Sequence, residues 1–252
     1  MKNAPPHNPC AVVELRQYTL HPGQRDPLIE LFDREFVETQ EAVGITVIAQ
    51  FRDLDRPDHF VWLRGFAGMA ERAAALAAFY GGPVWAAHRN AANATMIDSD
   101  DVLLLRPAGP TPPGVGLPFA GPPRAVVGAT RVPADVIVAQ VCPLRATGGA
   151  GAARHFDTHV APLLERAGAD IAGRYLTEAS PNTFPSLPVR EGENVFVWWA
   201  RFADAAAHER WQQRLAADPG WRDDVLPQWH RLLAGAPQVL RLAPTARSRW
   251  PA

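Results

Sequence analysis

The segments 59–106 and 195–243 carry the same order of predicted elements, and this internal repeat limits the architectures open to the chain. Each segment reads as a strand, a helix, a turn, a second short helix and a closing strand. Self-similarity of this kind indicates two copies of one structural unit. The corresponding positions are 60–66 with 196–202, Trp85 with Trp221, and 102–105 with 239–242.

The residues before the first segment complete a unit with the order β-α-β-β-α-β. Alternation predicts strands over 12–20 and 45–52, and apolar residues at helical spacing predict one helix over 24–42 between them. The later elements of this unit are strand 59–66, helices 69–80 and 83–95, and strand 100–106. This order is typical of a ferredoxin-like fold, in which one antiparallel sheet carries helices on a single face.

The composition along the chain divides it into two repeats and a linker. We predict a first repeat over 11–106, a linker rich in proline and glycine over 107–133, and a diverged second repeat over 134–244. Within the linker, 124–131 is a candidate edge strand.

Aromatic residues on the strands indicate how the two repeats pack. We expect Phe60, Trp62 and Phe66 to lie on the sheet face opposite the helices, as do Phe196, Trp198 and Phe202 in the second repeat. Exposing these rings would create an aggregation-prone patch. The predicted fold is therefore α+β, with two ferredoxin-like βαββαβ repeats packed sheet-to-sheet as an intramolecular α+β barrel.

Composition and charge exclude several classes of protein. The chain is 47% hydrophobic and 20% charged, which is typical of soluble globular proteins. It has no apolar run near the roughly 20 residues that span a bilayer, and its net charge of −1 does not favour nucleic acid or an anionic membrane as partner. Cys10 and Cys142 offer no disulfide framework. The first residues lack the apolar core of a secretory signal, so a cytoplasmic location is expected.

Three stretches resemble NIPSNAP proteins, and more narrowly the bacterial members of that family. They are E-L-R-x-Y-T-L-x-P-G at 14–23, F-V-W-L-R-G-F at 60–66, and A-F-Y-x-G-P-V-W-x-x-H-R-x-A-A-N-A-T-M-I-D-S-D at 78–100. The resemblance covers nearly all of 11–106 and, more loosely, 135–243. It implies the dimeric α+β barrel superfamily, whose members include small monooxygenases, polyketide cyclases, chlorite dismutase relatives and dehydratases. Fold alone does not select among these chemistries.

Strand alternation brings several charged residues to one face. Arg64 lies two residues from Trp62 and should share its inward orientation, together with Glu14, Arg16 and Tyr18 on the first strand. Val13 and Leu15 would then face the helices. Such a cluster inside the barrel is either a structural ion-pair network or a ligand site, because buried charges must be paired.

The helix predicted over 83–95 supplies a second cluster. Trp85, Arg89 and Asn93 share one stripe, His88 lies close by, and Tyr80 precedes the glycine pair at 81–82. The alternative interpretation is a cap or interhelix bond that holds this short helix on the sheet.

The second repeat loses most of these polar residues. The aligned pairs are Glu14 with Val138, Arg16 with Gln140, Tyr18 with Cys142, Arg64 with Ala200, and His88-Arg89 with Asp224-Val225. A motif needed only for folding should be kept in both copies, so this asymmetry favours one functional repeat.

His155 and His159 have the i, i+4 spacing of a helical metal site, with Asp157 between them. No third ligand lies at an obvious spacing, so we predict surface or packing histidines and no metal. The chain also lacks a glycine-rich phosphate loop and a dinucleotide fingerprint, and no cofactor is predicted.

The first functional hypothesis is a small-molecule-binding barrel, with the cofactor-independent cyclases, isomerases and monooxygenases as candidate enzyme types. Arg16 and Arg64 would hold a carboxylate or enolate, and Tyr18, Glu14 or His88 would handle a proton. The candidate substrate-binding set also contains Phe60, Trp62, Tyr80, Trp85, Arg89, Asn93 and Trp198.

The second hypothesis is a non-catalytic protein-binding or scaffold module, and the third is a haem- or metal-dependent enzyme with a histidine ligand. The sequence leaves open whether the protein is an enzyme, and it is compatible with a homodimer.

Overall fold

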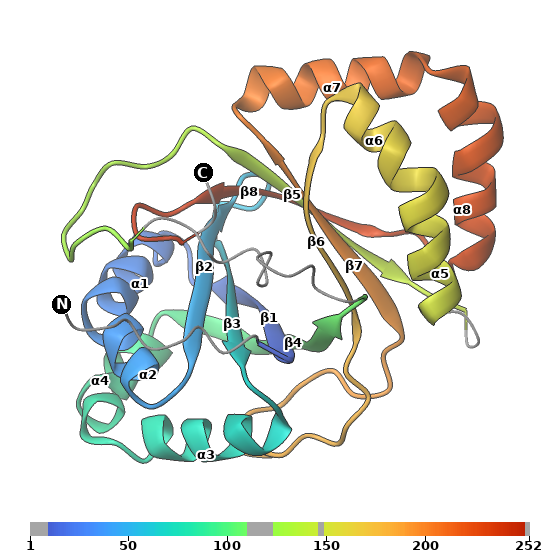
Figure 1. Ribbon diagram of the computed structural model, residues 1–252. Coiled ribbons are helices and arrows are strands. Elements are labelled where there is room, and N and C mark those ends of the chain that lie inside the picture. The colour runs from blue at the N-terminus through green and yellow to red at the C-terminus, as the bar shows by residue number, and fades with distance from the viewer. Residues whose placement is uncertain (1–9, 110–122, 146–148, 250–252) are drawn as a thin grey trace, which may run out of the picture.

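The structure, a computed structural model, describes residues 10–109, 123–145 and 149–249. In this part of the chain eight strands close into a barrel in the order β1-β3-β2-β8-β5-β7-β6-β4 (Figure 1). The strands are β1 (Val12–Leu20), β2 (Thr46–Asp53), β3 (His59–Phe66), β4 (Met96–Pro107), β5 (Val136–Pro143), β6 (Asp170–Thr177), β7 (Val195–Phe202) and β8 (Gln238–Pro244).

Each repeat contributes four strands in the same ferredoxin-like order. In the first repeat β1 is central between β3 and β4, and in the second β5 is central between β7 and β8. The two sheets join at their edges, where β2 pairs with β8 and β4 pairs with β6, all antiparallel. The predicted α+β barrel within one chain is confirmed.

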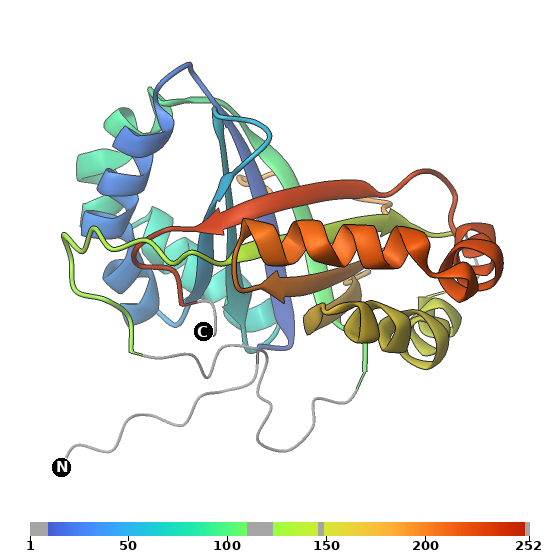
Figure 2. The same ribbon diagram turned by 90° about the horizontal axis from the view of Figure 1, so that it is seen from above.

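The helices form two layers outside the barrel, one over each repeat. Figures 1 and 2 show α1–α4 on one side of the strands and α5–α8 on the other. The helical segments are α1 (Arg25–Leu31), η1 (Phe32–Phe36), α2 (Val37–Ala42), α3 (Met69–Tyr80), α4 (Pro83–Asn93), α5 (Gly149–His155), η2 (Phe156–Val160), α6 (Ala161–Ala167), α7 (Ala205–Ala217), η3 (Gly220–Val225) and α8 (Leu226–Leu232). None of these described helices is long and apolar enough to cross a membrane.

The first long helix contains a π-helical turn that its periodicity did not predict. The segment 25–42 runs as α1, the π turn η1 and α2, and the second repeat has the π turn η2 at the matching place. Both turns open with a Phe-Asp pair, Phe32-Asp33 and Phe156-Asp157. Single π turns inside helices often occur at functional sites.

The orientation predicted for the strands is wrong. The barrel interior is lined by the face that carries Val13 and Leu15, together with Val61, Leu63 and Trp199. An eight-stranded barrel has an interior that side chains just fill, and this interior is dominated by aliphatic residues. The opposite face meets the helices, where the gap between sheet and helix layers accommodates larger rings.

The aromatic residues of both repeats lie in these outer layers. Phe60, Trp62 and Phe66 are buried with Phe32, Phe36 and Phe79 under α1–α4. Phe196, Trp198 and Phe202 are buried in the same way under α5–α8. The rings are therefore covered by each repeat's own helices and not by the opposite sheet.

The linker forms a strap instead of the predicted edge strand. Residues 123–135 contain no strand, and Gly128 sits in a turn with a left-handed φ of 84°. Arg124 anchors this strap by donating to the carbonyl oxygens of Val47 at 2.6 Å and Arg247 at 2.7 Å. The predicted linker residues 110–122 lie outside the described part of the chain.

Candidate functional site

Three arginines converge on the carboxylate of Glu14 between the first-repeat sheet and its helices. Arg16 Nη1 and Arg64 Nε donate to Glu14 Oε2 at 2.6 Å and 2.7 Å, and Arg72 Nε donates to Oε1 at 2.6 Å. All four side chains are buried, and none exceeds 2% exposure. We call these residues the Glu14 cluster.

Strand register and helix periodicity bring the cluster together. Glu14 lies opposite Arg64 in the β1–β3 pairing, and Arg16 follows two residues later on the same face of β1. Arg72 comes from the buried face of α3, which it shares with Ala75, Leu76 and Phe79. The sheet therefore supplies three members and the helix above it supplies the fourth.

The Glu14 cluster carries an excess of buried positive charge. Three guanidinium groups share one carboxylate, since Glu14 is their only salt-bridge partner among the described residues. Arg64 Nη2 and Arg72 Nη2 are buried and donate no hydrogen bond within the described structure. Burying unpaired charge is costly, so a net excess of about two positive charges favours an additional anion.

Aromatic faces and neutral acceptors offset part of this cost. The Arg64 guanidinium lies 5.2 Å from the Trp62 ring centroid and 5.8 Å from that of Tyr80. Arg16 Nε donates to the Tyr18 hydroxyl at 3.0 Å, and Arg64 Nη1 donates to Gln40 Oε1 at 3.3 Å. These contacts stabilise the cations without neutralising them.

The electrostatics determine the protonation of the cluster. Burial alone would raise the pKa of Glu14, but the charges of Arg64, Arg16 and Arg72 outweigh it and hold that pKa well below its usual range. Burial raises the pKa of Tyr18 despite the opposing charges of Arg16 and Arg64. Glu14 is therefore a fixed carboxylate, and Tyr18 a neutral phenol.

A cavity of about 640 Å³ lies beside the cluster. Arg16 and Tyr18, both buried, lie at its base, and Tyr80, Trp85 and Phe184 add aromatic walls. The remaining lining residues are Ala77, Gly81, Asn93, Met96, Ser99, Asp100, Ser186, Leu187 and Pro188. The cavity thus joins buried Arg16 to aromatic walls and to a polar part that includes Asn93 and Asp100.

The second repeat closes this first-repeat cavity with the loop 178–194 between β6 and β7. Asn182 Oδ1 and Thr183 Oγ1 accept from Arg72 Nη1 at 3.0 Å and 3.3 Å. The Phe184 ring stacks on Tyr80 with centroids 6.0 Å apart. The loop therefore contacts both the Glu14 cluster and the aromatic wall.

Five of the predicted site residues line the cavity: Arg16, Tyr18, Tyr80, Trp85 and Asn93. Glu14 and Arg64 are brought to the same site but lie behind it, outside the cavity lining. Phe60 and Trp62 pack beneath Tyr18, with ring centroids 6.3 Å and 5.9 Å away. The whole group faces the helices and not the barrel interior, which corrects the predicted location.

Three other predicted residues lie elsewhere. His88 Nε2 is 3.5 Å from Glu35 Oε2 on the helical layer. Arg89 is exposed and does not line the cavity. Trp198 is buried in the second repeat among Phe156 and its neighbours, so it cannot contact a ligand in the first repeat.

Arg72, Gln40 and the loop residues Asn182–Phe184 were missed by the sequence interpretation. Arg72 interrupts the apolar stripe of an alanine-rich helix. A charged residue at such a position indicates a buried charge that needs a partner. Gln40 similarly follows Phe36 and Val37 on a buried helix face. The loop residues carry no comparable signal, because they reach the site from the other repeat.

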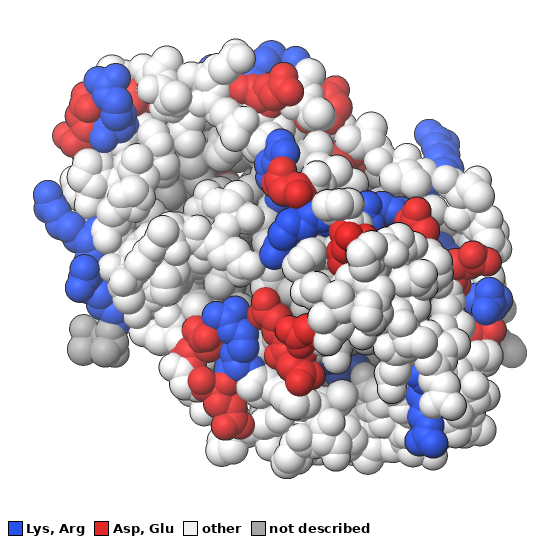
Figure 3. Space-filling model, turned by 180° about the vertical axis from the view of Figure 1, so that it is seen from behind, with Lys and Arg blue, Asp and Glu red and all other residues white. Residues whose placement is uncertain are grey.

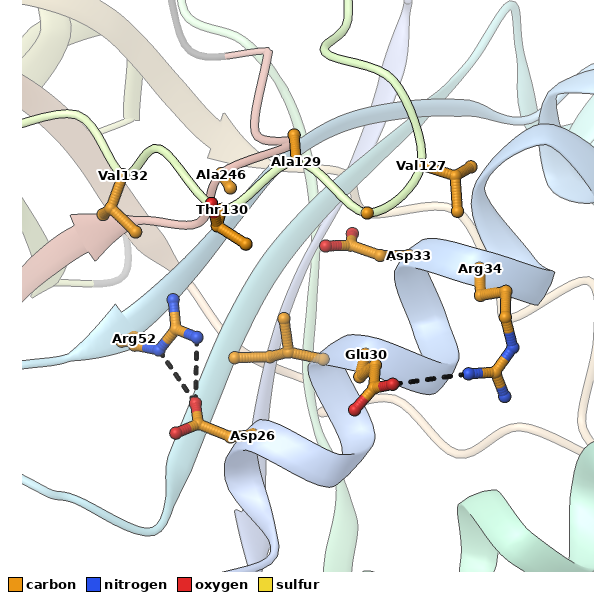
Figure 4. A pocket seen from close by; sticks show the side chains of 12 residues that line it. Asp26, Glu30, Asp33, Arg34, Arg52, Val127, Ala129, Thr130, Val132 and Ala246 are labelled. Carbon is orange, nitrogen blue, oxygen red and sulfur yellow. Dashed lines mark hydrogen bonds and ion pairs between the residues drawn. The ribbon is translucent and has the colours of Figure 1, made fainter.

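A second cavity of about 470 Å³ lies between α1, η1 and the strap (Figure 4). Asp26 pairs with Arg52 at 2.9 Å and Glu30 with Arg34 at 3.6 Å, while Asp33 extends toward the strap without a salt bridge in the described structure. Burial raises the pKa of Asp33 to about 6, against the opposing charges of Arg247, Arg124 and Arg52.

The repeats explain why the Asp33 carboxylate forms no salt bridge with any described residue. Its equivalent Asp157 forms an ion pair with Arg174 of β6. Arg174 lies opposite Trp198, and the corresponding position opposite Trp62 holds Gln50. The first repeat has therefore kept the carboxylate of this pair without its cation.

The histidine pair of the second repeat packs without further ligands. The rings of His155 and His159 are 4.8 Å apart, and His155 stacks on Trp229 at 6.2 Å. Among the described residues no group of three or more His, Cys, Asp or Glu is placed to hold a metal ion. The first-repeat cavity has no histidine among its lining residues, so the third hypothesis, with a histidine ligand, does not fit it.

Comparison with solved structures reveals the same fold over nearly the whole chain. A proposed monooxygenase from Lactobacillus acidophilus NCFM is 9% identical, with a TM-score of 0.54 over 94% of this chain and 97% of that chain. A second, from Fusobacterium nucleatum subsp. nucleatum ATCC 25586, is 7% identical, with a TM-score of 0.55 over 94% and 93%. An anthrone oxidase-like protein is 12% identical, with a TM-score of 0.50 over 96% and 95%. At these identities the likeness concerns the fold alone.

Sequence comparison identifies the first repeat. No curated protein matches the chain. Residues 13–112 match the family model NIPSNAP, and this range runs from the second residue of β1 through β4, with α1 to α4 between them. The first repeat of this chain is a NIPSNAP domain.

Proposed function

We propose that the first repeat binds an anionic small molecule with an apolar or aromatic body in the cavity above Arg16 and Tyr18. The observation that carries this proposal is the buried charge imbalance of the Glu14 cluster, where three guanidinium groups share one carboxylate. A ligand carboxylate or enolate would supply the missing negative charge, and charge-assisted bonds to arginine are among the strongest available.

Arg16 is positioned to make the polar contact. Its Nη2 group has only a long bond to the Ser99 carbonyl oxygen at 3.4 Å, so a better acceptor in the cavity could take this donor. The Tyr18 oxygen accepts from Arg16, which leaves its own O–H free to donate to the same ligand. Tyr80, Trp85 and Phe184 would surround the apolar body.

The same arrangement supports a cofactor-independent reaction in which negative charge develops on an oxygen atom. Arg16 and the neutral Tyr18 phenol would stabilise that oxyanion. Glu14 is a poor general base here, because three arginines lower its pKa and it does not line the cavity. The names of the structural neighbours make oxidation one reaction class to assay.

Calorimetric titration of a panel of aromatic and aliphatic carboxylates tests the proposal. Wild type should bind at least one of them, and Arg16→Gln should weaken binding by roughly 2–5 kcal/mol because a charged partner is lost. Glutamine is the residue at the equivalent position of the second repeat, Gln140. Arg16→Lys should also lose most of the affinity, since a point charge cannot replace the planar fork.

Two further variants keep the test decisive if Arg16→Gln folds poorly. Tyr18→Phe removes one donor and should weaken binding about fivefold to tenfold. Arg89→Gln changes an exposed arginine outside the cavity and should bind as wild type does. If no carboxylate binds wild type, the Glu14 cluster is a structural ion network and the proposal fails.

A further inference from the structure

The second repeat contains a cavity of about 220 Å³ between its sheet and helices, lined by four tryptophans. Trp198 comes from β7, Trp211 from α7, Trp221 from η3 and Trp229 from α8. We call this space the tryptophan cavity. Four tryptophans from four different elements converge on it.

The tryptophan cavity is the counterpart of the first-repeat cavity. Gln140 and Trp221 line it, and the equivalent residues Arg16 and Trp85 line the first-repeat cavity. The polar residues around the first site are replaced by Val138, Gln140, Cys142 and Ala200. None of the residues that line the tryptophan cavity is Lys, Arg, Asp or Glu. The second repeat has therefore kept a cavity while losing the charges.

The walls of the tryptophan cavity are held in place by further aromatic packing. Trp229 lies 5.6 Å from Phe196 and 5.7 Å from Phe156, between ring centroids. Trp211 lies 5.0 Å from Phe202. A preformed apolar wall loses little entropy when a ligand binds.

We propose that the tryptophan cavity is a second binding site, which takes a neutral aromatic molecule carrying one hydrogen-bonding group. A cavity of about 150 Å³ is known to hold benzene, so 220 Å³ suits a ligand of about the size of indole. The ligand is neutral because the lining offers no Lys, Arg, Asp or Glu to pair with an ion, and its one titratable side chain, His230, is exposed to solvent.

Gln140 supplies the polar contact. Its side-chain amide takes part in no hydrogen bond found within the described residues, and it is the only amide side chain in the lining. The oxygen can accept from a ligand N–H or O–H. Access is from the side of Val239, a residue of β8 that lines the cavity and is 51% exposed.

Calorimetric titration of the full chain with indole tests the site. Wild type should bind one indole per chain, and Val239→Phe, which places a ring at the mouth, should weaken binding at least tenfold. Val126→Phe is the matched control, because Val126 is 78% exposed and does not line the cavity. This control should bind indole as wild type does.

Indene, which has the ring skeleton of indole without the N–H, isolates the role of Gln140. Gln140→Leu should weaken indole binding about fivefold to tenfold, as expected for one lost hydrogen bond, and leave indene binding unchanged. The proposal is overturned if wild type binds neither compound, if Val239→Phe binds indole as wild type does, or if benzoate competes for the same site. Carboxylate binding in the first repeat is measured separately, so either site can fail alone.

Discussion

Glu14 and Arg64 lie opposite each other on β1 and β3, and Arg64 Nε donates to Glu14 Oε2 at 2.7 Å. The same pairing position on β5 and β7 holds Val138 and Ala200. One fold therefore carries an ion pair in one repeat and an apolar contact in the other. Because the apolar contact also supports the fold, the ion pair is not a requirement of this architecture.

Replacing Glu14 with glutamine should destabilise the protein strongly. Three buried arginines would lose their common carboxylate, and breaking a buried ion pair costs about 3–5 kcal/mol. Urea unfolding at pH 7 measures the change. Asp223→Asn, which removes an exposed pair with Arg222, is the control and should have little effect.

The stabilisation from Glu14 should also depend on pH. Its folded pKa is depressed, so the contribution is complete above the ordinary carboxyl pKa and declines as the pH falls below it. The difference in unfolding free energy between wild type and Glu14→Gln should therefore shrink in acid. An equally stable Glu14→Gln variant at pH 7 would contradict the buried network.

Phe184→Ala should weaken carboxylate binding about tenfold with little change in stability. Phe184 lies on a loop of the second repeat, lines the cavity and stacks on Tyr80, so its removal opens the aromatic wall. Calorimetric titration measures the carboxylate affinity, and thermal unfolding measures the stability. Leu54→Ala, at a 47% exposed position outside the cavity, serves as control. Unchanged affinity would show that the second repeat does not contribute to the site.

Asp33→Asn should stabilise the protein at pH 7 and have little effect at pH 4. The folded pKa of Asp33 is about 6, above its ordinary value of 3.8, so the folded state must ionise a carboxyl that burial disfavours. This cost is absent below pH 3.8 and is complete above about pH 6. Partial solvent screening reduces the gain to about 1–2 kcal/mol.

Unfolding curves of wild type and Asp33→Asn across pH 4–8 measure this effect. Asp157→Asn is the matched variant. Asp157 occupies the equivalent position in the second repeat, where it forms a salt bridge with Arg174. It should not stabilise the protein at any pH. A destabilised Asp33→Asn variant at pH 7 would contradict the raised pKa.

Trp198→Ala should lower the unfolding free energy by about 3–5 kcal/mol, the usual cost of removing a large buried ring. Trp198 is 3% exposed and packs against Phe156 beneath the second-repeat helices. Chemical denaturation measures the change. A loss below about 1 kcal/mol would mean that this layer is more open than the packing indicates.

The sequence by itself determined the repeat, the positions of the barrel strands and the residues that share a face. Alternation along a strand is a local property, so Glu14, Arg16 and Tyr18 were grouped correctly, as were Trp62 and Arg64. The high helix propensity of 69–80, the glycine pair at 81–82 and the proline at 83 similarly located α3 and α4.

Only the tertiary structure decided which face of each strand lies inside the barrel. Both faces of β1 are almost fully buried. A pattern of buried and exposed residues along this strand therefore cannot tell the barrel-facing side from the helix-facing side. Which face turns inward depends on the volume of the side chains. The closed barrel interior is filled by side chains such as Val13, Leu15 and Leu63, whereas the wider space under the helices accepts the aromatic rings and the arginines. Arg72 and Phe184 reach the site through contacts between elements distant in sequence, and no local pattern encodes such contacts.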